Sequence, residues 1–77
     1  MSLRRRTQKD HPTDVGDGRV LLATAVALLV RLDDTSAWIP RRAIDSGSEI
    51  PKDASVGVAG RLLVQPWFAR TRGWADR

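Results

Sequence analysis

The chain has 77 residues, a net charge of +4 and no cysteine. This length fits one small domain, near the lower limit at which a chain buries a sufficient core by itself. The absence of cysteine excludes disulfides and thiolate metal sites, and a single histidine leaves little for nucleophilic or metal chemistry. We therefore expect a protein that is not an enzyme, with no catalytic residues, no cofactor, no metal and no small-molecule substrate.

Residues 1–18 are polar, lack apolar periodicity and contain a His-Pro step and two glycines. They predict a flexible arm that ends in a turn, followed by one globular domain over residues 19–77. The arm begins with a basic run, which suits contact with nucleic acid but also simply keeps a small protein in solution. The arginines of this run are Arg4, Arg5 and Arg6.

Val20–Leu32 is the longest apolar segment of the chain. A helix here would be apolar on every side, whereas a strand separates the residues into two faces. Thirteen residues are long for one strand, so we expect a bend or break near Ala23–Ala25, with a helix as the alternative. The predicted core face holds Val20, Leu22, Thr24, Val26, Leu28, Val30 and Leu32. The predicted back face is mostly small and includes Ala23, Ala25 and Ala27.

The same apolar run, preceded by basic residues, also has to be compared with a secretory signal peptide. Acidic residues, a proline and two glycines separate the two parts, and no small-residue cleavage site follows. The apolar stretch between Arg19 and Arg31 is too short to span a bilayer. We expect a soluble, cytoplasmic protein that does not contact a membrane.

The middle of the chain predicts a hairpin. Asp33–Ser36 has turn chemistry, and the returning strand must be short because Pro40 belongs on an edge or at a strand end. Asp45–Lys52 reads as a loop. Ser55–Gln65 predicts a further strand in which Gly57 and Gly60 mark a turn or bulge.

The C-terminal segment predicts a short helix from Pro66 to Arg72. Proline suits the first helical position, and Gly73 suits the stop. A helix of two turns is not stable alone, so it must pack on the sheet. The expected fold is mainly β, of the β-rich α+β kind: a small curved antiparallel sheet or half-barrel of three or four strands with one short C-terminal helix.

Three segments together resemble a group of small, largely uncharacterised bacterial and phage proteins. These segments are Thr24–Val30 "TAVALLV", which matches T-x-x-A-x-L-V, then Ala37–Ile44 "AWIPRRAI" with its W-I-P-[KR] motif, and the C-terminal "PWFA". In the group, a second strand ends in P-x-W-[LF]-A with a Gly some residues later, and the resemblance covers roughly residues 24–74, with W-I-P-[KR] as its most specific part. The resemblance implies a compact sheet closed by a short C-terminal helix. Many members have Ser and Gln where this chain has Arg42 and Ala43, so a role of that serine does not transfer.

The three tryptophans differ in their expected burial. We expect Trp38 to lie in the core, because the chain has few large residues to fill it. Trp67 is also expected to be largely buried, since the short helix must dock on the sheet. Trp74 follows the helix stop and is predicted to be the least constrained aromatic residue.

Four arginines flank the hairpin and line the helix, and with Trp74 they make the candidate partner-binding patch. If the helix packs near the end of the Trp38 strand, the patch suits a phosphate backbone with an aromatic for an unstacked base. The alternative is that the first two form surface salt bridges with aspartates, with little energetic weight. These arginines are Arg41, Arg42, Arg70 and Arg72; the aspartates are Asp33, Asp34 and Asp45.

Two classes of function remain open. The first is an accessory protein that binds nucleic acid or a nucleoprotein complex through the arm and the arginine patch. The second is a phage-type protein-interaction module, such as an inhibitor, an adaptor or a self-associating subunit, which uses an open sheet edge or the alanine face. A homodimer fits the small core. Salt dependence distinguishes the classes, because phosphate binding weakens steeply as salt rises.

Overall fold

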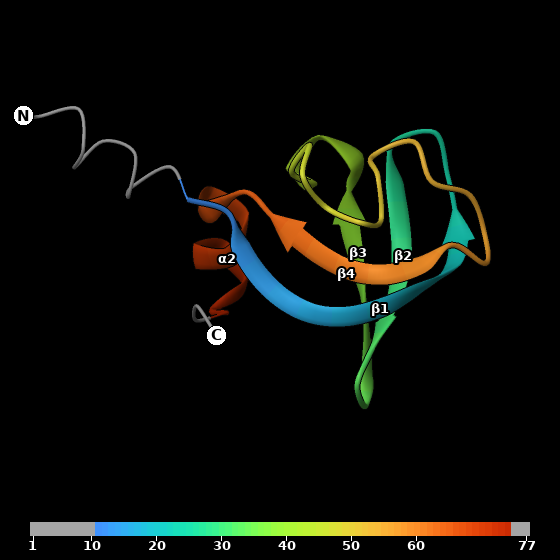
Figure 1. Ribbon diagram of the computed structural model, residues 1–77, viewed down its shortest axis with the longest axis horizontal. Helices are drawn as coiled ribbons and strands as arrows, with labels where there is room; N and C mark the ends of the chain where they lie inside the picture. The colour runs from blue at the N-terminus through green and yellow to red at the C-terminus, as the bar shows by residue number, and fades with distance from the viewer. Residues whose placement is uncertain (1–10, 75–77) are drawn as a thin grey trace, which may run out of the picture.

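The computed structural model describes residues 11–74, which form one curved antiparallel sheet with a short helix at one end (Figure 1). The strand order is β3-β2-β1-β4. This architecture confirms the predicted fold class. The elements are β1 (Thr13–Ala23), β2 (Ala27–Leu32), β3 (Thr35–Pro40), the 3-10 helix η1 (Arg41–Ala43), β4 (Ala59–Val64) and α2 (Pro66–Arg72). No described helix is long and apolar enough to cross a membrane.

Strand β1 is long and bent, and it causes the curvature of the sheet. Its register shifts twice, between Asp14 and Gly16 against β4 and between Val20 and Leu22 against β2. The Gly16 N–H donates to the Asp14 carboxylate at 2.9 Å, which stabilises the first bulge. Such bulges increase twist and bend a strand. The first part of β1 therefore pairs with β4 and the last part with β2.

The predicted boundary of the arm at residue 18 is wrong. Thr13 to Gly18 lie within β1 and pair with β4, so the ladder extends well into the segment expected to be flexible. Glycines at two of these positions hide the alternation that identifies a strand. Gly18 lies so close to β2 that a Cβ would come within 2.7 Å of the Val30 side chain. Residues 1–10 lie outside the described part of the chain.

The predicted break in the apolar segment is confirmed, because β1 ends at Ala23 and β2 begins at Ala27. Thr24 organises the turn: its N–H donates to the Ala27 carbonyl at 2.8 Å, and its hydroxyl accepts from the Ala27 N–H at 3.0 Å. The predicted core face is correct only in part. Val20, Leu28, Val30 and Leu32 are buried, but Leu22 and Val26 are 53% and 74% exposed. The bulge and the turn interrupt the alternation on which the prediction depended.

The core is mostly aliphatic and receives three residues from the long loop between η1 and β4. Ile44, Ile50 and Ala54 of this loop are buried in the same cluster as Ile39 and Phe68. Trp38, by contrast, is 45% exposed, so the prediction that it is buried is wrong. Ile39 takes the inward position of β3, and the loop fills the space that a tryptophan was expected to occupy.

The outer edge of β4 is covered by the same loop. The N–H groups of Asp45 and Glu49 donate to the carbonyls of Leu63 and Arg61, at 2.9 and 3.0 Å. The Ser48 hydroxyl accepts from the Leu63 N–H, and the Glu49 carboxylate accepts from the Arg61 N–H at 2.7 Å. The loop therefore provides the hydrogen-bond partners that a neighbouring strand would provide to β4, although it is not itself a strand.

Helix α2 has the predicted bounds. Pro66 occupies the first turn, and Gly73 ends the helix with a φ of 76°, in the left-handed region. Phe68 and Ala69 are the buried residues of the helix, whereas Trp67 is 40% exposed. The prediction that Trp67 is largely core is therefore wrong. Successive helix residues point about 100° apart, so only one of Trp67 and Phe68 can dock.

Candidate functional site

Helix α2 and the 3-10 helix η1 together present a basic and aromatic surface, which we call the helix-end surface. Its residues are Arg42, Trp67, Arg70 and Arg72. Arg42 follows β3 and lies over Trp67, with its guanidinium carbon 5.3 Å from the ring centroid. This distance is within the range of a cation–π contact. Because Phe68 is the buried aromatic residue of α2, the neighbouring Trp67 ring lies at the surface, where Arg42 of η1 contacts it.

A row of three aromatic rings runs along this end of the molecule. Phe68 makes edge-to-face contacts with Trp67 and Trp74, at centroid distances of 5.8 and 5.7 Å. The guanidinium carbon of Arg72 lies 5.9 Å from the Phe68 ring and 5.4 Å from the Trp74 ring. Arg42 therefore lies at the Trp67 end of the row and Arg72 at the Trp74 end, and Arg70 is a further exposed arginine of α2.

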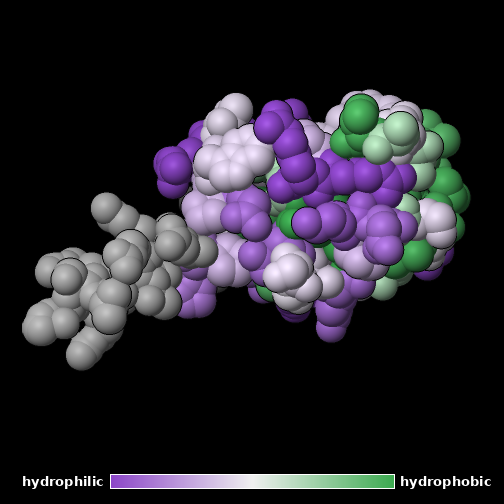
Figure 2. Space-filling view, turned by 90° about the horizontal axis from the view of Figure 1, so that it is seen from above, coloured by the Kyte–Doolittle hydropathy of each residue, from purple (hydrophilic) through white to green (hydrophobic). Residues whose placement is uncertain are grey.

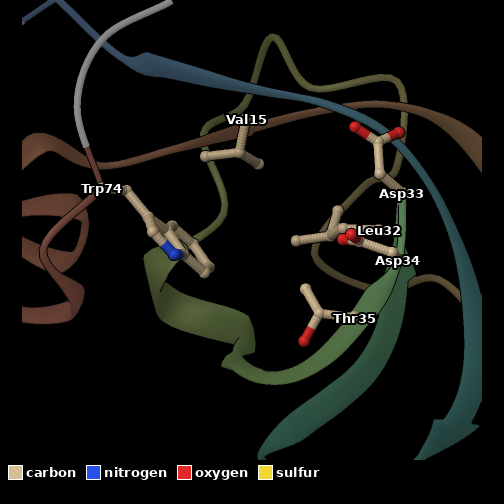
Figure 3. A pocket seen from close by; sticks show the side chains of 6 residues that line it. All are labelled: Val15, Leu32, Asp33, Asp34, Thr35 and Trp74. Carbon is tan, nitrogen blue, oxygen red and sulfur yellow. The ribbon is translucent and has the colours of Figure 1, made fainter.

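Trp74 is more constrained than the sequence predicts. It is half-buried and packs against the core, although it follows the helix stop. Figure 3 shows its indole reaching from the end of α2 toward Leu32, across a small cavity of about 110 Å³. Val15 and the turn at Asp33 and Asp34 complete the walls. Trp74 therefore packs against the core beside this cavity, whereas Trp38 and Trp67 are the more exposed tryptophans.

Arg41 does not belong to the helix-end surface. Its Nε donates to the Thr24 carbonyl at 2.9 Å, and its Nη1 donates to the carbonyls of Lys52 and Ala54, at 2.8 and 3.2 Å. These contacts connect the turn between β1 and β2 with the loop before β4. The structure therefore divides the predicted arginine patch and gives Arg41 a structural position.

The alternative prediction, surface salt bridges from Arg41 and Arg42 to nearby aspartates, is not seen within residues 11–74. The ion pair found there joins Arg61 to Asp14 at 3.1 Å. The Asp45 carboxylate accepts from the Gly47 N–H and from the Gln65 side chain. The hydrogen bond with Asp14 and the attraction of its charge raise the pKa of Arg61 above its ordinary value. No carboxylate of the described chain contacts the three arginines of the helix-end surface.

A second surface lies on the convex face of the sheet, where the register aligns Leu22, Leu29 and Trp38 across three strands. Sequence reasoning missed this row because it placed two of these residues in the core. Ala23 and Ala25 of the predicted alanine face are exposed, and Ala27 is half-buried. Figure 2 shows hydrophobic residues gathered at the end of the molecule away from α2. Val26 and Val56 are among the exposed large hydrophobic residues.

Arginines are also paired on the convex face. Arg19 of β1 lies opposite Arg31 of β2, and both are exposed. Like charges directly opposite each other on a sheet are unfavourable unless a partner compensates them. Only knowledge of the strand register brings these two residues together, so sequence reasoning had no signal for them. Within residues 11–74, no cluster of three or more metal-ligating side chains is found.

No protein-family model matches the chain, and no curated protein or solved structure is significantly similar to it. The resemblance to small bacterial and phage proteins therefore stays a prediction. Function has to be argued from the surfaces of this molecule.

Proposed function

We propose that this protein is a non-catalytic accessory protein that binds nucleic acid, or a nucleoprotein complex, through the helix-end surface. The observation that carries the proposal is the group Arg42, Arg70 and Arg72, whose charges no described carboxylate contacts, along an aromatic row in which the Trp67 ring is 40% exposed. Arginine is well suited to phosphate because its planar fork donates several hydrogen bonds. An exposed aromatic ring offers a face on which an unstacked base can stack.

The N-terminal arginines support the same site. Thr13 pairs with Val64, which is close in sequence to the start of α2. The chain that carries Arg4, Arg5 and Arg6 is therefore attached at the same end of the sheet as the helix. Added cations near a phosphate-binding surface increase both affinity and salt dependence.

The test is fluorescence anisotropy of labelled single- and double-stranded oligonucleotides with the full chain, at about 50 and about 200 mM salt. The triple variant Arg42→Ala/Arg70→Ala/Arg72→Ala should lose at least about tenfold in affinity and have a smaller salt slope. The matched control Arg19→Ala/Arg31→Ala/Arg61→Ala removes the same charge elsewhere and should lose less. Trp67→Ala should weaken single-strand binding by about 1–3 kcal/mol and double-strand binding less.

Two results would contradict the proposal. One is no binding of either oligonucleotide at the lower salt concentration. The other is an equal loss in the two triple variants, which would show attraction to net charge without a site.

The alternative function, a phage-type inhibitor or adaptor that binds a protein, is favoured by the exposed apolar residues. Leu22 is 53% exposed and Trp38 is 45% exposed on one face of the sheet. A partner bound there would be released by Leu22→Ser/Trp38→Ser and would be little affected by salt. Binding that is lost in this variant and retained in the helix-end variant would favour the alternative.

A further inference from the structure

Within residues 11–74, the outer edge of β3 carries backbone groups without hydrogen-bond partners. Leu32 and Thr35 flank a two-residue turn and therefore form a hydrogen-bonded pair, and at the other end of β3 the Arg41 N–H donates to the Val26 carbonyl at 2.9 Å. Hydrogen-bonded and non-hydrogen-bonded pairs alternate along an antiparallel ladder. Counted from either end, Ser36 and Trp38 belong to non-hydrogen-bonded pairs, so their N–H and C=O groups point away from β2. Within residues 11–74, the N–H and C=O groups of these two residues have no hydrogen-bond partner.

We propose that this edge binds a second copy of the chain, with the two β3 strands antiparallel about a two-fold axis at Ala37. Ser36 of each copy then lies opposite Trp38 of the other. Each of these residues exchanges both backbone hydrogen bonds with its opposite. The four bonds satisfy every free group of Ser36 and Trp38 on both copies. An axis at Trp38 would instead set Ser36 against Pro40, which has no N–H to donate.

The charges near the two ends of β3 are complementary in this register. Asp33 and Asp34 of one copy lie opposite Arg41 and Pro40 of the other, and Arg42 follows in the chain. The two aspartates are exposed, and no cation within residues 11–74 contacts them. The Arg41 guanidinium is bound by carbonyls, which leave its positive charge uncompensated. The two-fold axis repeats this acidic-to-basic contact, so it occurs twice in the dimer.

The side chains of the outer face also fit the pairing. Trp38, which is 45% exposed in one copy, would face the small Ser36 of the other. Arg31 lies beside Ser36 on β2, so its guanidinium comes within reach of the incoming Trp38 ring. The dimer would thus cover both an exposed aromatic side chain and an open sheet edge. Left uncovered, an open sheet edge promotes aggregation.

Sedimentation velocity of the full chain, between about 10 µM and about 1 mM, tests the proposal. The mass should rise with concentration from 8.5 kDa toward twice that value. Ser36→Pro removes an outward N–H and leaves the ladder to β2 intact, so it should keep the far-UV circular dichroism and abolish the rise. Asp34→Arg should weaken association at least about tenfold, and adding Arg42→Asp to it should restore association.

The matched control is Arg70→Asp, which changes the charge as much as Arg42→Asp but lies away from β3, and it should leave the association constant of the wild-type chain unchanged. The proposal is overturned if the wild-type chain stays at the mass of one copy over the whole range. It is also overturned if folded Ser36→Pro associates as well as the wild-type chain, or if Asp34→Arg has no effect.

Discussion

The two edges of the sheet differ in what lies beside them. Along β4, the loop 44–50 meets each outward backbone group near Arg61 and Leu63 with a backbone or side-chain partner. Along β3, the outward groups of Ser36 and Trp38 have no such partner in the described chain. Proteins generally cover or blunt sheet edges because an open edge pairs with other strands. This difference is why we propose that a second copy binds at the β3 edge and not at the β4 edge.

The largest expected effect concerns Ile50, the buried residue of the loop that covers the β4 edge. Ile50 is fully buried, at 0% exposure, although it belongs to a loop. Ile50→Ala should lower the free energy of unfolding by about 2–4 kcal/mol, because it leaves a cavity in the core. Urea denaturation measures the loss. Val56→Ala, in the same loop but 60% exposed, is the control. Equal stability of the two variants would show that the loop does not anchor the β4 edge.

A smaller effect is expected from Ser48, whose side chain forms hydrogen bonds with the backbone of the β4 edge. The Ser48 hydroxyl accepts from the Leu63 N–H at 3.1 Å and donates to the Arg61 carbonyl at 3.2 Å. Ser48→Ala should cost about 1 kcal/mol of stability. It should also speed hydrogen exchange of the Leu63 amide, while the exposed neighbour Ser46→Ala leaves this amide protected. An unchanged exchange rate in Ser48→Ala would mean that the backbone contacts of the loop are sufficient.

The smallest effect is expected on the open edge. Trp38→Thr should change the free energy of unfolding by no more than about 0.5 kcal/mol at micromolar concentration, because the ring is exposed. Ile39→Thr, one residue further along the same strand, should cost more than about 2 kcal/mol since Ile39 is fully buried. Chemical denaturation of both variants measures the difference. Equal losses would place the Trp38 ring in the core after all.

The sequence predicts the helix best, because both of its ends carry residues with strong local backbone preferences. Pro66 begins it and Gly73 ends it, and each residue acts locally whatever the rest of the chain does. The hairpin at Asp33–Asp34 is predicted for the same reason, whereas the break after Ala23 is predicted from the length of the apolar segment. The start of β1 is not, since one bulge and two glycines remove the alternation from its first half.

The scarcity of large residues predicts that Trp38 and Trp67 are buried, and this reasoning fails for a physical reason. The core is filled by Phe68 and by aliphatic residues, which include Ile50 and Ala54 from a loop that periodicity does not mark. The candidate site is predicted in part. Arg42, Arg70 and Arg72 lie at the same end of the molecule, but Arg41 turns toward backbone carbonyls. Whether an arginine meets carbonyls or solvent depends on loop positions that only the folded chain defines.

Arg41 has a consequence for anyone who redesigns this scaffold. One guanidinium binds carbonyl oxygens from two segments, at Thr24 and at Lys52 and Ala54. Insertions or grafted peptides in either segment would displace the shared cation and disturb the other segment as well. The two loops therefore have to be engineered as a single unit, and a lysine, with its compact ammonium in place of a planar fork, is not an equivalent replacement.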